Sequence, residues 1–416
     1  MNSEIQKNLR FNFIVNLLDG GFFGFAMGFT SFVTIIPLFV NTFTSSAILI
    51  GLIPAIHSMG WQLPQLLIAN RVSRLKRYKW MVLWMTIHER IPFIGLGIIA
   101  WYSPVLGGKA SLVLIFLMLI WQGVGGGLAA TPWISLIGKI IPIKIRGTFF
   151  GAQGATANVL ASVSAVLAGM ILQRFSSPGD YTICFLLTGI GMTLSWIALA
   201  LTREPEFISN HEHQTERVFW SNLRIILQKD SDFRRFLLVR MMTQFTVMSF
   251  AFYTVYAVRK HGMSVAIAGV MTAILMATQI VASPILGWMG DRFGHRPILE
   301  IGAFTAIASA LIAWYAPSVG WFYLVFPLVG ITNVTTWTIP LAMVLEFGSE
   351  VERPAYIGLA NTLIAPATFI APLLGGWLAD SAGYPATFIA SAVLGMITAA
   401  LLHWYVRDPR LREKES

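Results

Sequence analysis

Long apolar runs recur along the whole chain and decide what it can fold into. Each run is long enough to cross the roughly 30 Å hydrocarbon layer of a bilayer as a helix. Runs of this length favour a helical bundle over a barrel, whose strands show only a weak alternating pattern. Residues are 56% hydrophobic and only 12% charged, which leaves too little polar surface for a water-soluble fold. The sequence therefore predicts an all-α polytopic membrane protein.

Twelve membrane spans are predicted from these runs. The first span follows a weakly basic start but is too long for a signal-peptide core, so we expect an uncleaved helix. The spans cover approximately residues 11–40, 46–69, 80–102, 110–137, 147–173, 181–202, 234–258, 264–290, 297–316, 319–346, 355–381 and 384–406.

The distribution of basic residues predicts the orientation. Of the 29 Lys and Arg residues, 23 fall at the chain ends and in loops on one side, and four fall on the other side. By the positive-inside rule both termini lie in the cytoplasm, with the chain in the plasma membrane. The formal charge of +10 is scattered over short loops, which argues against a nucleic-acid partner. The single cysteine, Cys184, cannot form an intrachain disulfide.

An internal repeat divides the chain. The segment from Arg10 aligns with the segment from Arg235, and the fifth span from Arg146 aligns without gaps to the segment from Arg353. This indicates two six-helix halves, residues 1–202 and 234–416, related by an axis along the membrane normal. In the linker, residues 203–233, apolar residues from Phe219 to Leu227 follow helical spacing and predict a short amphipathic helix on the membrane surface.

A loop motif, "GWMGDRFGHRP" at residues 287–297, lies between the eighth and ninth spans. It resembles the G-x-x-x-D-R-x-G-R/K-R/K signature of the major facilitator superfamily, with His295 at the first basic position. The resemblance extends over the whole chain through span count, repeat and orientation, and implies a fold of two pseudo-symmetric six-helix halves. The matching residues are Gly287, Asp291, Arg292, Gly294 and Arg296.

The motif predicts a latch at the cytoplasmic side. A carboxylate can accept backbone N–H groups at a helix N-terminus, where the helix dipole favours an anion. The fifth span begins at Arg146. We expect Asp291 to contact the start of this span, near Gly147. The first-half copy of the motif is degenerate, with Asn70 followed by Arg71, so the mirror latch at the span that begins with Arg353 should be weaker.

The fourth span contains "WQGVGGG", which resembles the family element R-x-x-Q-G-x-G through Gln122, Gly123 and Gly125. Leu119 occupies the arginine position, which in proton-exchanging members of the family is tied to coupling. We expect the glycines to permit close helix packing.

Three ionisable groups in "TIHERIPF", residues 86–93, lie within the third span. A charged side chain near the bilayer centre costs about 3 kcal/mol even on a lenient scale, so each needs a partner. Asp19 lies at nearly the same depth as Glu89 and Arg90, about 14 Å from the same face. We expect these three residues to form a network, with His57 or His88 as further candidates. The network is either a proton-coupling site or a fixed ion pair between helices.

Polar residues in other spans are candidates for the wall of a central cavity, although each is also suited to hydrogen bonding between helices. Their mostly neutral character favours an uncharged or amphipathic substrate. Arg240 and Glu300 are expected near the cytoplasmic ends, in the gate or extended toward water. The cavity candidates are Asn16, Gln122, Gln244, Asn333, Thr336 and Trp337.

The resemblance implies a monomeric secondary transporter for a small molecule. We expect proton coupling and efflux of amphipathic compounds, with nutrient or metabolite uptake as an alternative and a non-transporting receptor as a further one. An enzyme is not expected, because the sequence shows no nucleotide-binding loop, metal cluster or nucleophile triad, and we predict no cofactor.

Overall fold

The computed structural model describes residues 3–32, 34–44, 47–205, 216–263 and 265–407. Over these residues the chain is helical and contains no strand. Eleven helices in this part are long and apolar enough to cross a membrane. The all-α polytopic fold predicted from the sequence is therefore confirmed.

The second predicted span, residues 46–69, is divided into two shorter helices. The first, α3 (Ala47–Gln62), ends before Leu63, and α4 (Gln65–Val72) begins after Pro64. Proline lacks the backbone N–H needed inside a helix and is tolerated at a helix start. The second predicted span is the one that is missing from the eleven helices that meet the length criterion.

The chain packs into two compact units. Unit 1 comprises Met1–Pro142, Thr156–Thr215 and Ser349–Thr362, and unit 2 comprises Ile143–Ala155, Glu216–Gly348 and Leu363–Ser416. Two short segments therefore pack away from the half of the sequence to which they belong. Residues 143–155 precede the linker yet lie in unit 2, and residues 349–362 follow it yet lie in unit 1.

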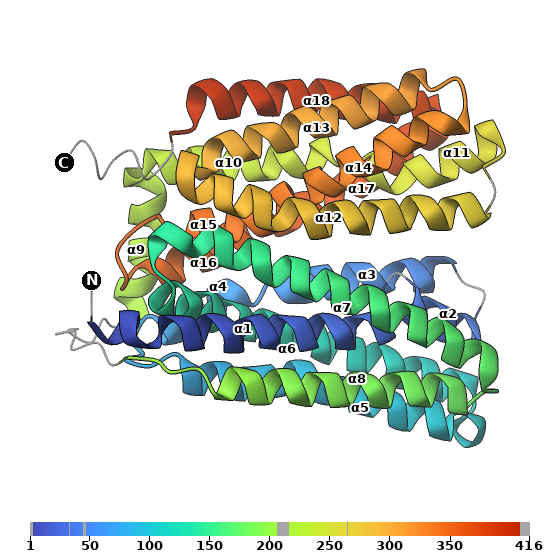
Figure 1. Ribbon diagram of the computed structural model, residues 1–416, viewed down its shortest axis with the longest axis horizontal. Coiled ribbons are helices and arrows are strands. Elements are labelled where there is room, and N and C mark those ends of the chain that lie inside the picture. Colours follow the sequence, from blue (N-terminus) through green and yellow to red (C-terminus); the bar gives the residue numbers. More distant parts are fainter. Residues whose placement is uncertain (1–2, 33, 45–46, 206–215, 264, 408–416) are drawn as a thin grey trace. The chain divides into compact units, whose positions relative to one another are not determined.

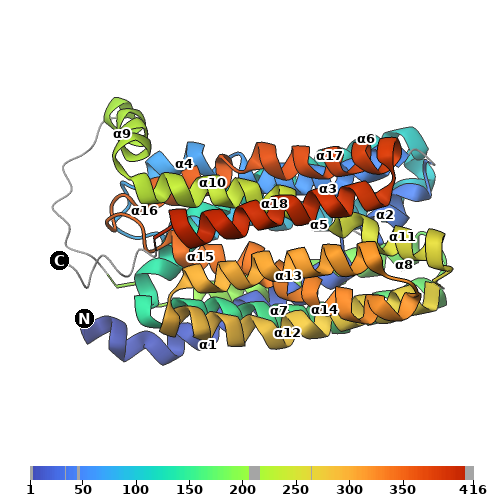
Figure 2. The ribbon, with the colours of Figure 1, turned by 90° about the horizontal axis from the view of Figure 1, so that it is seen from above.

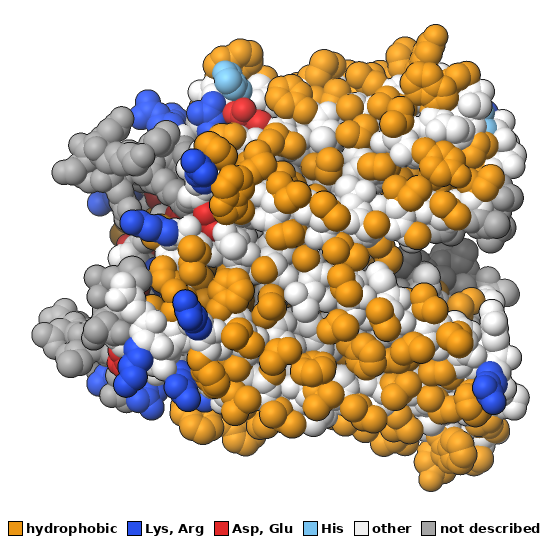
Figure 3. All heavy atoms as spheres, in the orientation of Figure 1, with side chains coloured by type: hydrophobic (Ala, Val, Ile, Leu, Met, Phe, Trp, Pro, Cys, Tyr) orange, Lys and Arg blue, Asp and Glu red, His pale blue; other side chains and the backbone are white. Residues whose placement is uncertain are grey.

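Unit 1 is a bundle in which α1 packs on α8, and α5 packs on both α6 and α8 (Figure 1). On the face drawn in Figure 3, hydrophobic side chains cover the sides of its helices, and most Lys and Arg side chains gather at helix ends. Its helices, besides α3 and α4, are α1 (Ser3–Phe29), α2 (Ile35–Asn41), α5 (Lys79–Leu106), α6 (Gly108–Ile140), α7 (Arg146–Arg174) from residue 156 onward, α8 (Gly179–Ala200) and α16 (Arg353–Thr362).

Glycines on α6 allow the close helix packing that the sequence predicted. A Cβ atom added to Gly125 would lie 2.4 Å from the backbone of His88 on α5. One added to Gly127 would lie 2.3 Å from the carbonyl oxygen of Gly60 on α3. Small residues at such crossings let backbones approach, which is how membrane helices gain packing energy. The approach of α5 to α6 places Glu89 beside Gly126.

Unit 2 is a bundle in which α13 packs on α14 and α18, and α10 packs on α17 and α18 (Figure 2). Its helices are α9 (Glu216–Lys229), α10 (Ser231–Thr246), α11 (Tyr253–His261), α12 (Val265–Phe293), α13 (His295–Tyr315), α14 (Phe322–Asn333), α15 (Ile339–Val344), α17 (Ala365–Ala382) and α18 (Tyr384–Tyr405), with the short helical turns η1 (Ile143–Ile145), η2 (Phe250–Phe252), η3 (Val319–Trp321) and η4 (Val334–Thr338).

The predicted linker helix is present as α9, in which Leu223 and Ile226 are buried and Trp220 is exposed. Residues 206–215 of the predicted linker lie outside the described residues, as does the side chain of Phe219. The surface location of α9 on a membrane and the division of the sequence at residues 203–233 stay predictions.

Candidate functional site

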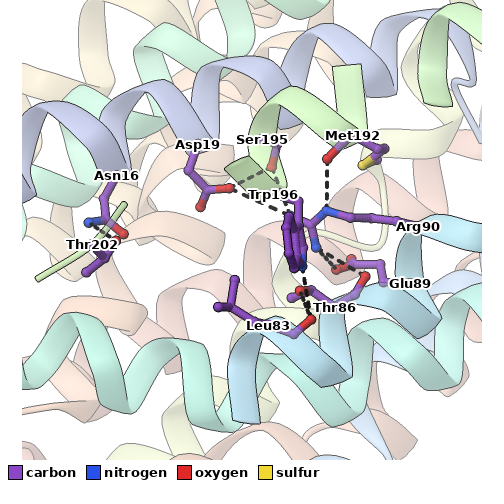
Figure 4. Close-up of polar contacts among 10 residues, drawn as sticks. All are labelled: Asn16, Asp19, Leu83, Thr86, Glu89, Arg90, Met192, Ser195, Trp196 and Thr202. Atoms are coloured by element: carbon purple, nitrogen blue, oxygen red, sulfur yellow. Dashed lines mark hydrogen bonds and ion pairs between the residues drawn. The ribbon is translucent and has the colours of Figure 1, made fainter. Parts of the chain in front are cut away.

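Asp19 and Arg90, two of the three charged residues of the predicted network, are joined through a serine. Asp19 on α1, Glu89 and Arg90 on α5 are each less than 10% exposed. Arg90 Nη2 donates to Ser195 Oγ on α8 at 2.9 Å, and Ser195 Oγ donates to Asp19 Oδ1 at 2.6 Å (Figure 4). The direct distance from Arg90 Nη2 to Asp19 Oδ1 is 3.7 Å. The hydroxyl thus connects an acid and a base that lie on different helices.

Backbone carbonyls fix the Arg90 guanidinium in this position. Its Nε donates to Met192 O at 3.1 Å, and its Nη1 donates to Thr86 O at 3.2 Å. The same Nη1 lies 3.9 Å from Glu89 Oε2, at the limit of an ion pair. Arg90 therefore has one carboxylate on either side, and both lie in a part of the chain that water reaches poorly.

The sequence predicted the three charged residues of this cluster but missed their connection to α8. Ser195 is fully buried in an otherwise apolar segment, and Trp196 on the same helix donates to Leu83 O at 3.1 Å, which fixes α8 against α5. A lone serine in an apolar span is common between membrane helices, so no local pattern indicated that this one joins a charged pair.

Neither candidate histidine belongs to this cluster among the described contacts. His57 Nδ1 lies 3.1 Å from Gln122 Oε1, and its ring stacks on Phe32 with the centroids 4.0 Å apart. His88 is exposed and accepts a hydrogen bond from Trp121 Nε1 at 3.4 Å. Adjacent helix positions point about 100° apart, which explains why His88 turns outward while Glu89 turns inward.

The predicted cavity residues separate into three environments. In unit 1, Asn16 is buried and donates to Thr202 Oγ1 at 3.1 Å, and Gln122 is the partner of His57. In unit 2, Gln244 and Thr336 line a pocket. Asn333 is not among the lining residues of that pocket, and Trp337 is 42% exposed.

Arg240 occupies a different place from the one expected. It is 7% exposed and lines the same pocket as Gln244 and Thr336 instead of extending toward water, and its place in a gate stays a prediction. Arg240 is the tenth residue of α10 (Ser231–Thr246), and counting residues from the end of the span did not give the direction of its side chain. Glu300, by contrast, is half-buried and accepts from Arg296 Nε at 3.1 Å.

Asp291 makes the contact that its motif predicted. Its carboxylate accepts from Gly147 N at 2.8 Å and from Thr148 N at 2.5 Å, at the start of α7. Two charge-assisted bonds and the positive end of the helix dipole stabilise the anion there. Both partners belong to unit 2, because residues 143–155 pack in that unit.

Glycines allow this contact to form. A Cβ atom added to Gly287 would lie 2.1 Å from Gly147 O, and one added to Gly151 would lie 2.2 Å from Ser283 O. Gly294, with φ of +92°, ends α12 and begins α13, a backbone conformation that L residues rarely adopt. The motif glycines therefore serve close approach and a sharp turn between helices.

The motif arginines have separate partners. Arg292 lies over the Trp288 ring at 5.5 Å, and Arg296 donates to Glu300 and to the carbonyl of His403. Arg146 Nη1 donates to Leu345 O at 3.0 Å. These bonds connect the ends of several helices of unit 2.

The degenerate copy in unit 1 has the neutral amide of Asn70 in place of the aspartate. Asn70 Oδ1 accepts from Arg74 Nη2 at 2.9 Å, and Arg71 is exposed. Instead, α4 is joined to α16 by Asn361 Nδ2, which donates to Gln65 Oε1 at 2.7 Å. Arg353, at the start of α16, is buried and lies 3.9 Å from the Glu350 carboxylate.

Glu204 has a buried side chain and was missed by sequence reasoning. Its carboxylate accepts from Tyr78 N and Lys79 N, both at 2.8 Å, and thereby caps the start of α5. It also lies 2.8 Å from Lys139 Nζ at the end of α6. Burial raises the pKa of Tyr78 to about 12, so its phenol stays neutral at physiological pH. A Glu directly after a span was the available signal.

Comparison with known proteins adds a family match. Residues 236–416 match a model of the Major Facilitator Superfamily. The chain is 26% identical over 142 residues to the class B tetracycline resistance protein of Escherichia coli, with 34% of this chain and 35% of that protein aligned. It is 30% identical over 146 residues to the class H tetracycline resistance protein of Pasteurella multocida, with 35% and 36% aligned. The aligned part thus spans about a third of these curated relatives.

A solved structure matches nearly the whole chain. The Escherichia coli fucose:proton symporter superposes with a TM-score of 0.73 at 14% identity, covering 95% of this chain and 98% of that one. At such low identity the likeness establishes the fold alone.

Proposed function

We propose that the chain is a proton-coupled secondary transporter of a small molecule within the major facilitator superfamily, a model of which matches residues 236–416. In this proposal the plasma membrane holds the chain with both termini in the cytoplasm, and two halves move by alternating access. Members of this family are transporters and not enzymes.

The observation that carries the proposal is the position of Arg90 between two carboxylates. Arg90 is bridged to Asp19 through Ser195 and lies 3.9 Å from Glu89. One guanidinium balances one carboxylate, so the fully ionised cluster has a net charge of −1 in a poorly hydrated region. Binding one proton makes the cluster neutral, and coupled acids of this kind titrate as a group.

A structural ion pair is the competing explanation for the same cluster. Arg90 is fixed by the carbonyls of Met192 and Thr86 as well as by Ser195, which suits a residue that holds α5 against α8. Buried pairs can serve such a purpose without titrating. The two explanations differ in what the loss of one carboxyl group does to proton movement.

Efflux of amphipathic compounds is the proposed direction. Its support is the similarity to two tetracycline resistance proteins over about a third of their length. Uptake by symport is the second candidate, and its support is the structural likeness to a fucose:proton symporter. Both need the same kind of proton site, so one assay addresses both.

The test is proton movement in liposomes that contain the purified protein and a pH-sensitive dye. A panel of amphipathic drugs and sugars is added under an imposed proton gradient, with the wild type beside Asp19→Asn and Glu89→Gln. We expect substrate-evoked proton movement in the wild type and its loss in at least one variant, with substrate exchange retained. The sign of the proton flux gives the direction of transport.

Asp180→Asn is the matched control, because Asp180 is a buried carboxylate of unit 1 outside the cluster, and its Oδ1 accepts from Tyr181 N. It should keep coupled transport. Undiminished proton movement in both Asp19→Asn and Glu89→Gln would make the cluster a structural ion pair and overturn the proposal.

A further inference from the structure

Helix α9 runs crosswise to α10, the membrane helix that follows it in the chain (Figure 1, Figure 2). The corner between them is at Asp230, whose Oδ1 accepts from Phe233 N at 3.0 Å and caps α10. A candidate membrane span, Ser231–His261, begins directly after this corner. Because α9 lies outside the span and crosswise to it, α9 is oriented along the membrane surface.

Arg234 fixes the C-terminal end of α9 beside an exposed side of α10. Its Nη1 donates to Leu227 O at 2.7 Å and also to Gln228 O. Arg234 is exposed, and Leu238, one turn further into the span, is 43% exposed. An exposed leucine in a membrane span contacts hydrocarbon, and basic side chains near the end of a span extend to the headgroups. The end of α9 is therefore held at the level of the lipid headgroups.

The two sides of α9 differ in exposure. Leu223 and Ile226 are each 6% exposed and pack against the protein. On the other side, Trp220 and Ile225 are each 41% exposed. Large apolar side chains are unfavourable in water but suit the boundary between headgroups and acyl chains, where tryptophan is enriched. The exposed side of α9 thus suits contact with lipid.

Two basic residues accompany the exposed apolar ones. Arg224 lies four positions after Trp220, and Lys229 lies four positions after Ile225, so each basic side chain is the helical neighbour of an apolar one. Both basic residues are exposed, and neither forms an ion pair with a described residue. Cations at a membrane surface attract anionic headgroups. The exposed side of α9 therefore combines apolar insertion with unbalanced positive charge.

From these observations we propose that α9 binds anionic phospholipids of the leaflet in which it lies. Arg224 and Lys229 bind the headgroups, and Trp220 and Ile225 insert between the headgroups and the acyl chains. A location at the membrane surface does not by itself distinguish one lipid from another, whereas two unbalanced cations select a headgroup with net negative charge. This inference does not depend on proton coupling at Asp19 or on the direction of transport.

The experiment measures amide hydrogen exchange of α9 in the purified full chain, reconstituted in nanodiscs. Discs of phosphatidylcholine are compared with discs that also contain phosphatidylglycerol. We expect slower exchange of the α9 amides in the anionic discs, and loss of this difference at high salt, which screens exposed charges. A cation near an anionic surface contributes about fivefold to binding, so Arg224→Gln and Lys229→Gln should each reduce the protection by about that factor.

Three controls make the result specific. Arg71→Gln removes an exposed arginine of α4 in unit 1 and should leave the protection of α9 unchanged. Inorganic phosphate added to phosphatidylcholine discs separates a free anion from a lipid, and we expect no protection from it. Unchanged exchange of the α13 amides shows that each variant is folded.

Three results would overturn the proposal. They are equal exchange of α9 in the two kinds of disc, protection by inorganic phosphate without anionic lipid, and an undiminished lipid effect in the double variant Arg224→Gln with Lys229→Gln. No substrate or proton gradient is present in this measurement. Failure here is therefore distinct from failure of the proposed transport function.

Discussion

Two helix crossings, one in each unit, are built at equivalent positions of the internal repeat and are held by different chemistry. In unit 2, Asp291 on α12 binds the start of α7 through two backbone N–H groups. In unit 1, where Asn70 replaces the aspartate, α4 and α16 are joined by a bond between the neutral side chains of Gln65 and Asn361. The two copies of an internal repeat can therefore share a helix crossing although one uses an aspartate and the other uses amide side chains.

The two crossings also differ in how closely the backbones approach. Gly287 and Gly147 meet so closely in unit 2 that a Cβ atom on Gly287 would lie 2.1 Å from a carbonyl oxygen. The position equivalent to Gly287 is Leu66, and the closest approach there is made by Gly358, whose added Cβ would lie 2.9 Å from Leu66 Cα. The charged crossing is thus the tighter one, since the backbone donors must reach the carboxylate.

The largest effect is expected from removing the charge. Asp291→Ala leaves two backbone N–H groups at the start of α7 without their acceptor and should lower the free energy of unfolding by about 2 to 3 kcal/mol. Reversible unfolding in mixed micelles measures this change. Asp380→Ala removes an exposed carboxylate of α17 and is the control. Equal losses in the two variants would show that the dipole contact contributes little.

Closing the gap between the backbones should have the next largest effect. Gly287→Ala forces α12 away from α7 and should cost about 2 kcal/mol, since overpacking a tight contact is destabilising. Gly376→Ala, on α17, meets only a Phe252 ring atom at 3.7 Å and should change stability little. The same unfolding assay compares them, and a stable Gly287→Ala would contradict the tight-crossing argument.

A smaller effect is expected in unit 1. Asn361→Leu removes the donor to Gln65 and should cost about 1 kcal/mol, in the range found for hydrogen bonds between membrane helices. Thr362→Val tests the neighbouring bond, in which Thr362 Oγ1 donates to Gln62 O at 3.0 Å. If Asn361→Leu destabilised the protein as much as Asp291→Ala, the proposed difference between the crossings would be wrong.

The smallest effect should follow from restoring the charge in unit 1. Asn70→Asp is expected to change the free energy of unfolding by no more than about 0.5 kcal/mol, because Arg74 already binds this side chain. The double variant Asn70→Asp with Arg74→Gln frees the introduced carboxylate and sharpens the comparison. A gain in stability in the double variant alone would indicate that this carboxylate then reaches α16.

Much of this arrangement follows from local rules that a sequence displays. Span length predicts the helices, and an aspartate in a glycine motif predicts a contact with a helix start, because both depend on backbone geometry common to all chains. Glu89 and Arg90 were predicted as buried because their depth in an apolar run is simple to count. Pro64, however, divides the second span in a way that hydropathy alone did not reveal.

Other features depend on packing between distant segments. Ser195 joins Asp19 to Arg90 only because α8 lies against both α1 and α5. Arg240 faces a pocket because the π-helical turn at Val334–Thr338 and α13 form its wall. The π-helical turn also shifts the helical register between α14 and α15. Residue spacing along that segment therefore no longer gives the direction of its side chains.

Residues 349–362 lie late in the sequence but pack in unit 1, and this has a consequence for synthesis on the ribosome. Unit 1 includes residues 349–362, so its bundle stays incomplete until most of the chain has been made. Before then the amide of Gln65 has no Asn361 to bind, and α4 has no α16 against which to pack. A first half expressed by itself would expose this face of α4, whereas coexpression with the second half would restore its partner.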